Sequence, residues 1–456
     1  MKKVVAYFAL IILFSTFLLG GCGFFGNRTD TLKILNFADY LDLSLLDDFK
    51  EYYFDKYGRN LNIVYDTSNA NENIYTKISK GKEDWDLVCV SDYTMQKMKR
   101  EGLLLPLDAS LLTNYGNVSP FIKDSYQILQ ENAPGDNNIY SVDYMWGTMG
   151  IFYNSDYVDA NDVLDWSVLW NKDYAGKIYM KDSVRDTVAA AVLYLRQDEF
   201  LNLPVNNFDD VETRNARQNL FNDLDPEFID EIEQALRQQK IDLKVKYDID
   251  FDKDEMATGK AYLDVAWSGD VAWAIMQASK GVNLGYSIPL EGSNLWFDGW
   301  CVPKYSKNPT AATEFVNFVL NEDNAIANME DTGYTSCVST PKVLEWAENN
   351  WQENAGYYNQ NLYSANTAID VSYFFDNADS VCVNPVMYPP ASDISRCMIM
   401  NEYSKDTNDK VLKMWTQVKG GMPEYVYYAL SAFLVVLIGL IIYFVVKNKR
   451  TNKKNK

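Results

Sequence analysis

Carboxylates are the side chains with which this chain is best equipped to do chemistry. Its 456 residues include 63 acidic and 42 basic side chains, which give a formal net charge of −21, and no histidine. The absence of histidine excludes a Ser-His-Asp triad, a Cys-His pair, a histidine-ligated zinc and an HExxH metalloprotease site. Enzymes that use carboxylates alone remain possible. The acidic balance opposes nucleic acid binding and favours a cationic partner, although solubility by itself would also account for it.

Cysteines offer little further chemistry. The chain has six, without CxxC or metal-ligand spacing, and we expect neither a metal site nor a cofactor. Cys89 and Cys301 lie in apolar segments, so we expect them in the core. A disulfide remains possible among Cys337, Cys382 and Cys397.

Alternating strands and helices must position the reactive side chains. Apolar patterns predict strands at 32–37, 61–65 and 85–90, and helices at 44–57 and 71–82. This order predicts a parallel α/β sheet, and such sheets bind ligands at the carboxyl ends of their strands. We therefore expect ligand contacts in the segments that follow two of these strands, Phe37-Ala-Asp-Tyr40 and Ser91-Asp-Tyr93.

A second set of strands and helices follows residue 140. A strand, a polar turn and a helix recur over 178–195, and 261–267 begins another such unit. Strands are also predicted at 286–289 and 300–303, and one helix at 310–328. We therefore predict an α/β fold of two lobes, with the ligand bound between them, where closure removes water.

Both ends of the chain carry membrane signals. An apolar run after two lysines ends in Leu19-Gly-Gly-Cys22, which is typical of a secretion signal and resembles a bacterial lipobox with Cys22 as the lipidated residue. An uncleaved transmembrane anchor is the alternative. Residues 425–446 contain no charge and are long enough to cross a bilayer as a helix. Six basic residues lie in 447–456, so this tail is predicted to be cytoplasmic and the main body extracytoplasmic.

Collinear motifs give the most specific signal in the chain. They are Asn36-Phe-Ala-Asp-Tyr40, Tyr75-Thr-Lys-Ile78, Asp86-Leu-Val-Cys-Val-Ser91, Tyr140-Ser-Val-Asp-Tyr-Met-Trp-Gly147, Gly150-Ile-Phe-Tyr-Asn154, Trp166 to Tyr174, Trp267-Ser-Gly-Asp270, Trp296-Phe-Asp298 and Gly333-Tyr334. In this order they resemble the bacterial spermidine/putrescine-binding proteins of polyamine ABC transporters, from about Leu32 to Tyr334. The resemblance implies a two-lobed periplasmic-binding-protein-like fold with a ligand cleft between the lobes.

The predicted organisation combines this resemblance with the two membrane signals. It comprises a signal peptide (1–21), a lipidated linker (22–31), lobe 1 (32–145), lobe 2 (146–296), a return to lobe 1 (297–340), a C-terminal segment packing on the lobes (341–422), a transmembrane helix (425–446) and a basic cytoplasmic tail (447–456).

The resemblance also implies a set of ligand-binding residues. They are Phe37, Asp39, Tyr40, Ser91, Tyr93, Asp186, Trp267, Asp270, Trp296, Asp298 and Tyr334. A polyamine carries ammonium groups joined by methylenes, so carboxylates would bind its charges and aromatic faces would cover its chain. Single residues also have structural explanations: Asp39 as a helix cap, Trp267 as a core residue and Asp186 as a surface charge.

Two departures from the family pattern bear on the ligand. Relatives that hold spermidine often carry an acid three residues before the position of Asp186, where this chain has Ser183. The motif Trp267-Ser-Gly-Asp270 resembles putrescine-preferring relatives. Putrescine is therefore favoured over spermidine.

The leading functional hypothesis is capture of a polyamine and its delivery to ABC permease subunits, without enzymatic turnover. One alternative is a sensor of polyamines or other organic cations, which the extra transmembrane helix supports. A second is an anchored carboxylate-type hydrolase acting on glycans.

Overall fold

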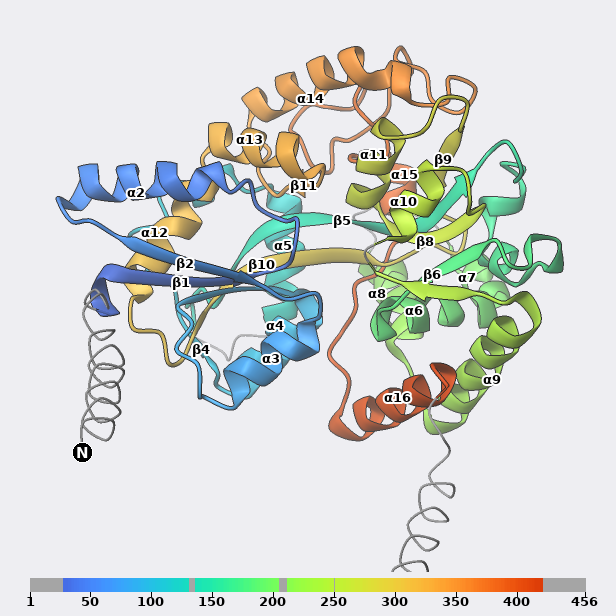
Figure 1. The fold of residues 1–456 in the computed structure, drawn as a ribbon, viewed down its shortest axis with the longest axis horizontal. Coiled ribbons are helices and arrows are strands. Elements are labelled where there is room, and N and C mark those ends of the chain that lie inside the picture. The colour runs from blue at the N-terminus through green and yellow to red at the C-terminus, as the bar shows by residue number, and fades with distance from the viewer. Residues whose placement is uncertain (1–27, 131–135, 205–210, 250, 421–456) are drawn as a thin grey trace, which may run out of the picture.

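The computed structural model describes residues 28–130, 136–204, 211–249 and 251–420, which form two α/β halves that share one mixed sheet (Figure 1). Its strands are β1 (Thr31–Asn36), β2 (Asn62–Thr67), β3 (Leu87–Ser91), β4 (Leu104–Leu105), β5 (Ser141–Asn154), β6 (Ile178–Lys181), β7 (Lys246–Asp248), β8 (Leu263–Trp267), β9 (Leu284–Ser287), β10 (Leu295–Pro303) and β11 (Thr335–Ser336). The main path runs β2-β1-β3-β10-β5-β8-β6-β7. We call the part around β1 to β3 the β1 half and the part around β6 to β8 the β6 half.

Helices cover both halves. They are α2 (Ser44–Tyr57), α3 (Asn71–Ser79), α4 (Asp92–Arg100), α5 (Pro120–Gln130), α6 (Val184–Leu195), α7 (Gln197–Asn202), α8 (Val211–Asn222), α9 (Pro226–Leu243), α10 (Asp252–Ala257), α11 (Ser268–Met276), α12 (Pro309–Val319), α13 (Glu322–Thr332), α14 (Pro341–Asn354), α15 (Ala391–Ile394) and α16 (Lys405–Val418). The early strands and helices lie within a few residues of their predicted positions. The apolar run of β3 is buried along its first four residues, as expected for a strand covered on both faces.

The sheet is mixed, whereas the strand–helix alternation predicted a parallel one. Pairing is parallel within β2-β1-β3 and within β7-β6-β8, but β5 and β10 are antiparallel to each other and to their neighbours. These two long, fully buried strands run from one half into the other (Figure 1). The lobe boundaries predicted at 145/146 and 296/297 fall inside β5 and β10.

The single helix predicted at 310–328 is wrong, because the chain forms two helices there. Asn321 adopts an extended conformation between α12 and α13, and its side chain accepts a hydrogen bond from the backbone N–H of Asp323. An asparagine cap followed by Glu322 and Asp323 favours a new helix N-terminus at this point.

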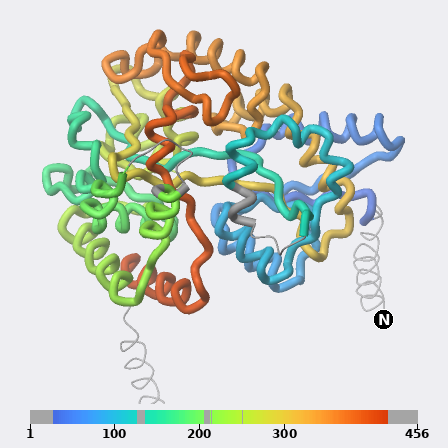
Figure 2. The backbone as a smooth tube through the Cα atoms, turned by 180° about the vertical axis from the view of Figure 1, so that it is seen from behind, coloured from blue at the N-terminus to red at the C-terminus, as the bar shows by residue number. Residues whose placement is uncertain are grey.

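Each half has its own apolar core. The β1 half packs Phe49 of α2, Trp300 of β10 and Phe315 of α12 around its strands. The β6 half packs Trp166 and Ile232 against the strands and α6, and residues 398–418 add further apolar side chains to this core. The C-terminal segment 398–418 therefore belongs structurally to the β6 half, and it descends along the boundary between the halves in both views (Figures 1 and 2).

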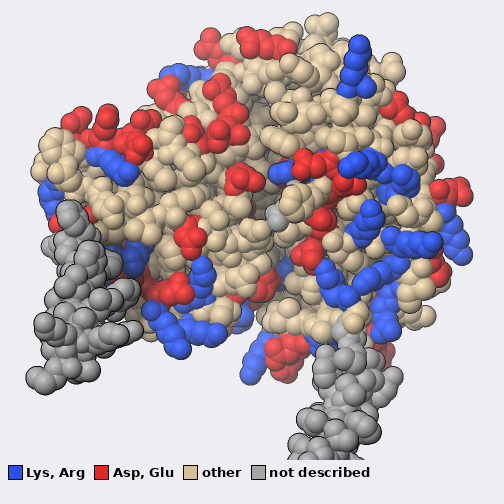
Figure 3. All heavy atoms as spheres, in the orientation of Figure 1, with Lys and Arg blue, Asp and Glu red and all other residues tan. Residues whose placement is uncertain are grey.

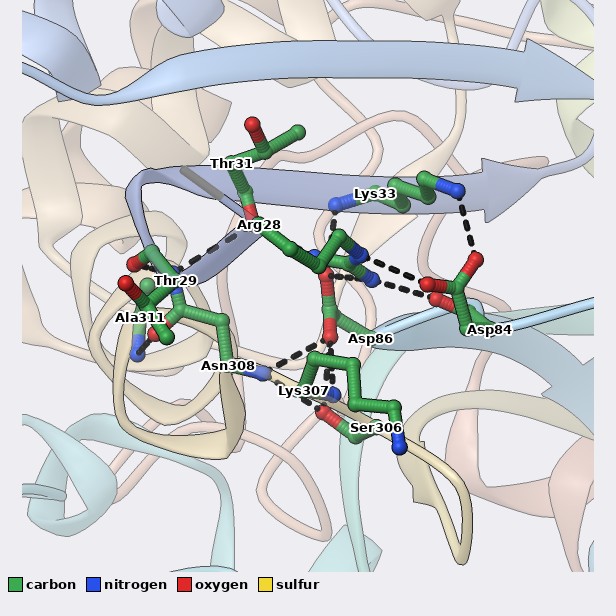
Figure 4. A network of polar contacts seen from close by, with 10 residues as sticks. All are labelled: Arg28, Thr29, Thr31, Lys33, Asp84, Asp86, Ser306, Lys307, Asn308 and Ala311. Carbon is green, nitrogen blue, oxygen red and sulfur yellow. Dashed lines mark hydrogen bonds and ion pairs between the residues drawn. The ribbon is translucent and has the colours of Figure 1, made fainter. Parts of the chain in front are cut away.

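A buried aspartate fastens the start of the described chain to the sheet (Figure 4). Asp86 forms an ion pair with Arg28 at 2.8 Å, and its Oδ1 accepts hydrogen bonds from the backbone N–H groups of Lys307 and Asn308. Asp84 forms a second ion pair with Arg28 at 2.7 Å. This network connects the residues before β1 with the turn after β10.

The five cysteines of the described chain are all free. Cys89 and Cys301 are fully buried in the core, which confirms their predicted place. The disulfide left open at Cys337, Cys382 or Cys397 does not form in the described structure.

Candidate ligand-binding cleft

A cleft of about 1070 Å³ lies between the two halves. Its wall includes every residue that the family resemblance implied as a ligand contact: Phe37, Asp39, Tyr40, Ser91, Tyr93, Asp186, Trp267, Asp270, Trp296, Asp298 and Tyr334. The β1 half contributes the loop after β1 and the β3–α4 junction, and the β6 half contributes the starts of α6 and α11. The topology thus brings together segments that lie up to about 300 residues apart in the sequence.

The cleft wall is strongly acidic. Among the described residues it holds nine carboxylates and one basic side chain, Lys253. Figure 3 shows acidic side chains on both sides of the hollow between the halves. Five of the nine are exposed at the mouth (Asp39, Glu72, Asp182, Asp254 and Asp331), and four are buried (Asp92, Asp186, Asp270 and Asp298). Such a wall attracts cations and repels anions.

Asp298 is a buried acid with one uncompensated oxygen. It lies on β10 beside a register shift between Asp298 and Gly299, opposite Ser91 of β3. The Tyr40 hydroxyl donates a hydrogen bond to Oδ2 at 2.8 Å, while Oδ1 has no partner among the described groups. The pKa of Asp298 is raised to about 6, because burial and the charge of Asp186 raise it more than the polar side chains of Ser91 and Tyr40 lower it.

Asp186 faces Asp298 from the other half of the molecule. It lies in the first turn of α6, and the indole N–H of Trp267 donates a hydrogen bond to its Oδ1 at 3.3 Å. Burial raises the pKa of Asp186, against hydrogen bonds from Ser183 and Trp267 that lower it. The two acids repel each other, and a bound cation would relieve that repulsion.

Aromatic rings form the remaining walls around this acid pair. Tyr40 and Tyr334 meet edge to face with ring centroids 4.8 Å apart, and Trp296 lies 5.9 Å from Tyr334. Gly269 of the Trp267-Ser-Gly-Asp270 motif makes room for this arrangement, because a Cβ there would meet the Tyr334 ring at 2.4 Å. The sequence motif therefore serves ring packing as well as the cleft's charge.

Asp270 differs from Asp298, although both are buried in the same cleft. The ammonium of Lys181 lies 3.0 Å from Asp270 Oδ2, and Oδ1 accepts a hydrogen bond from Tyr334 at 3.0 Å and contacts Lys253 at 3.4 Å. Burial by itself would raise the pKa of Asp270, but Lys181 and Lys253 reverse the effect and hold it below its usual range. Asp270 is therefore already compensated within the protein.

The remaining predicted residues lie at the rim and the back of the cleft. Asn71 donates a hydrogen bond to the Ser91 hydroxyl at 2.9 Å and accepts one from the Ser91 backbone N–H at 3.0 Å. Asp39 is exposed at the mouth with a left-handed backbone (φ 51°). Its side chain does not cap α2, because the N-cap residue of that helix is Leu43 and no side-chain hydrogen bond caps it.

Contacts across the cleft hold the two halves together. The guanidinium of Arg185, on α6, lies between the ring of Tyr93, 4.2 Å away, and the ring of Tyr403, 3.7 Å away. Arg100 on α4 forms an ion pair with Glu402 of the segment before α16. These contacts join α4 of the β1 half to α6 and the C-terminal segment.

The family model of bacterial extracellular solute-binding proteins matches residues 44–358 of this chain. The chain belongs to this family. The spermidine/putrescine-binding periplasmic protein of Salmonella typhimurium is 28% identical over 329 residues, which cover 72% of this chain and 83% of that protein. The putrescine-binding periplasmic protein PotF of Escherichia coli is 24% identical over 404 residues, covering 86% and 92%. The solved spermidine/putrescine ABC transporter substrate-binding protein PotD from Streptococcus pneumoniae is 25% identical with a TM-score of 0.57, covering 85% of this chain and 98% of that one.

These comparisons confirm the predicted resemblance and the α/β fold of a solute-binding protein. The extracytoplasmic character of the family agrees with the predicted side of the membrane. The signal at 1–21, Cys22 and the transmembrane segment at 425–446 lie outside the described residues. In the part that the structure describes, no helix has the length and apolar character that a membrane crossing needs.

Sequence reasoning missed residues of the cleft wall and one buried residue behind it, Lys181. Lys181 directly precedes the polar turn at 182–186, and its place at a strand end was a usable signal. Lys253 and Trp415 carried no such signal, because α10 and α16 were not predicted as parts of the wall. Their position depends on long-range packing.

Proposed function

We propose that this solute-binding protein captures a polyamine in the cleft and delivers it to the permease of an ABC transporter. The observation that carries this proposal is Asp298: a buried carboxylate with aromatic rings around it that has, among the described residues, a free oxygen and no basic partner. A buried carboxylate without a counter-charge is costly, and a ligand ammonium would supply that charge.

The walls suit the rest of a polyamine. Methylene groups between the amines can pack on Trp267, Trp296 and Tyr334, and aromatic faces attract ammonium groups by about 2 kcal/mol when water is excluded. The excess of carboxylates in the wall repels anionic ligands, whereas it does not by itself exclude neutral ligands such as sugars. Relatives named for spermidine/putrescine and for putrescine support the same class of ligand.

Putrescine is the ligand that we favour over spermidine. Ser183 stands where spermidine-holding relatives often have an additional acid, and Ser183 lines the cleft. We propose that all eleven predicted residues form the binding surface, with Asp298 and Asp186 as the acids that bind ligand ammonium groups and Asp270 held by Lys181 and Lys253. A protein of this kind binds without turnover, in agreement with the names of its relatives.

The membrane placement completes the proposal. A lipid on Cys22 and a helix at 425–446 would keep the cleft outside the cytoplasm, in the same membrane as the permease. The predicted lobes, 32–145 with 297–340 and 146–296, would close over the ligand. The C-terminal segment 341–422 would pack on them.

A thermal-shift screen of the purified chain in mild detergent tests the ligand class. The panel is putrescine, cadaverine, spermidine, spermine, choline, arginine and neutral sugars. A ligand at 100 times its Kd stabilises a folded protein by about 2.7 kcal/mol, so the melting temperature should rise clearly with a polyamine. A folded protein that none of the polyamines stabilises would refute the proposal.

A further inference from the structure

The buried acids of the cleft differ in how they are neutralised. The protein's own amines occupy Asp270: Lys181 on Oδ2, and Lys253 with Tyr334 on Oδ1. Asp298 and Asp186 instead contact hydroxyl groups and an indole N–H, without a lysine or arginine ion pair among the described residues. Asp270 is therefore compensated by ion pairs, whereas Asp298 and Asp186 are not.

Lys181 lies behind the cleft wall, with its ammonium over the ring of Trp267. Its side chain is fully buried, and its ammonium lies 2.8 Å from Asp252, 3.0 Å from Asp270 and 4.5 Å from the centre of the Trp267 ring. This is the environment that a ligand ammonium would seek: two carboxylates and an aromatic face. In this structure the ammonium of Lys181 occupies that environment.

Ion pairs compensate this cluster. Burial raises the pKa of Asp264 well above its usual range, which favours its neutral form. Asp252 and Asp270 face Lys181 and Lys253, two carboxyl groups against two ammonium groups. A further ammonium brought to Asp270 would meet Lys253, which is about one-fifth exposed and lies in the cleft wall.

We propose that Lys181 and Lys253 are specificity-determining residues that neutralise Asp270, so that one ligand ammonium alone is anchored in a buried site, at Asp298 and Asp186. This rests on the proposed function. Any second amine of the ligand lies near the exposed acids of the mouth, where water screens it and the gain is small. The buried site then recognises one terminal ammonium and the aliphatic chain that follows it, and the further amines of a polyamine add little affinity.

Titration calorimetry of the purified chain with n-butylamine, putrescine and spermidine tests the inference. We expect n-butylamine to bind within about tenfold of putrescine, and spermidine to bind within about tenfold as well. Putrescine binding with n-butylamine more than 100-fold weaker would overturn the inference while leaving the proposed function intact. Absence of binding by all three would overturn both.

A variant sharpens the test. Lys253→Met keeps the aliphatic stem but frees Asp270 towards the cleft, so putrescine should gain about tenfold in affinity relative to n-butylamine. Lys342→Met, which removes an exposed lysine from the surface of α14, is the matched control and should leave the ratio unchanged. An unchanged ratio in Lys253→Met, in a variant that melts like the parent, would contradict the role of Lys253. Lys181→Met is a second variant, expected to shift the ratio the same way if it folds.

Discussion

Asp298 and Asp270 are two buried aspartates of one cleft, yet their surroundings give them opposite properties. Asp298 has a free oxygen and a raised pKa, whereas two lysines hold the pKa of Asp270 below its usual range. Each follows a tryptophan in a short motif, Trp296-Phe-Asp298 or Trp267-Ser-Gly-Asp270. The difference teaches that an acid in a family motif is free to bind a ligand cation only where the protein has not already supplied the counter-charge.

The largest effect is expected from Asp298→Asn. The amide can still accept the Tyr40 hydrogen bond, but a ligand ammonium buried beside it would have lost its principal counter-charge. We expect polyamine affinity to fall by about 3 kcal/mol, or about 100-fold, in titration calorimetry. Asp331→Asn, at the exposed mouth, is the control and should change affinity less than threefold. Equal losses in both variants would remove the distinction between buried and exposed acids.

Asp270→Asn should affect the fold more than the ligand. It removes a charged partner from Lys181 and Lys253, and we expect the free energy of unfolding to fall by about 2 kcal/mol. Thermal and urea unfolding measure this loss, and calorimetry at a temperature where the variant is folded measures binding. A stable variant that has lost polyamine binding would show that Asp270, rather than Asp298, is the ammonium site.

The raised pKa of Asp298 predicts a pH dependence of binding. Since this pKa is about 6 in the free protein, affinity should be level above pH 7 and about tenfold lower at pH 5, where the carboxyl is protonated. The stability of the ligand-free protein has the opposite sign. A carboxyl with a raised pKa stabilises the fold at low pH, and this contribution is lost as the pH rises through about 6. Both trends should shrink in Asp298→Asn, and an unchanged pH profile there would assign them to another group.

The smallest effect concerns the contacts between the halves. Arg100→Gln and Glu402→Gln each break an ion pair whose arginine side chain is 57% exposed, so each should lower ligand affinity by less than about 1 kcal/mol, mainly through faster dissociation. Stopped-flow measurement of ligand release checks this. The exchange variant Arg100→Glu with Glu402→Arg should restore the parent rate; failure of the exchange would show that the pair does not stabilise closure.

Local patterns were sufficient to predict much of the fold. The early strands and helices followed from apolar periodicity, and the family motifs named eleven residues that line one cleft. The antiparallel placement of β5 and β10 was not predictable from alternation, because strand direction depends on how the halves are connected. The break at Asn321 depended on one capping side chain.

The charge state of the cleft could not be predicted from the sequence. Lys181 and Lys253 are 72 positions apart, and each reaches Asp270 only through the packing of β6, α10 and α11. Neither spacing nor composition shows such a meeting. The sequence could therefore place Asp270 in the cleft but could not show that it arrives there already neutralised.

A crystal structure of the protein with putrescine tests the central comparison most directly. We expect one ligand ammonium within hydrogen-bonding distance of Asp298 Oδ1, the methylenes against Trp296 and Tyr334, and Lys181 and Lys253 still paired with Asp270. A ligand ammonium seated on Asp270, with Lys253 displaced and Asp298 left without a cation, would contradict this expectation.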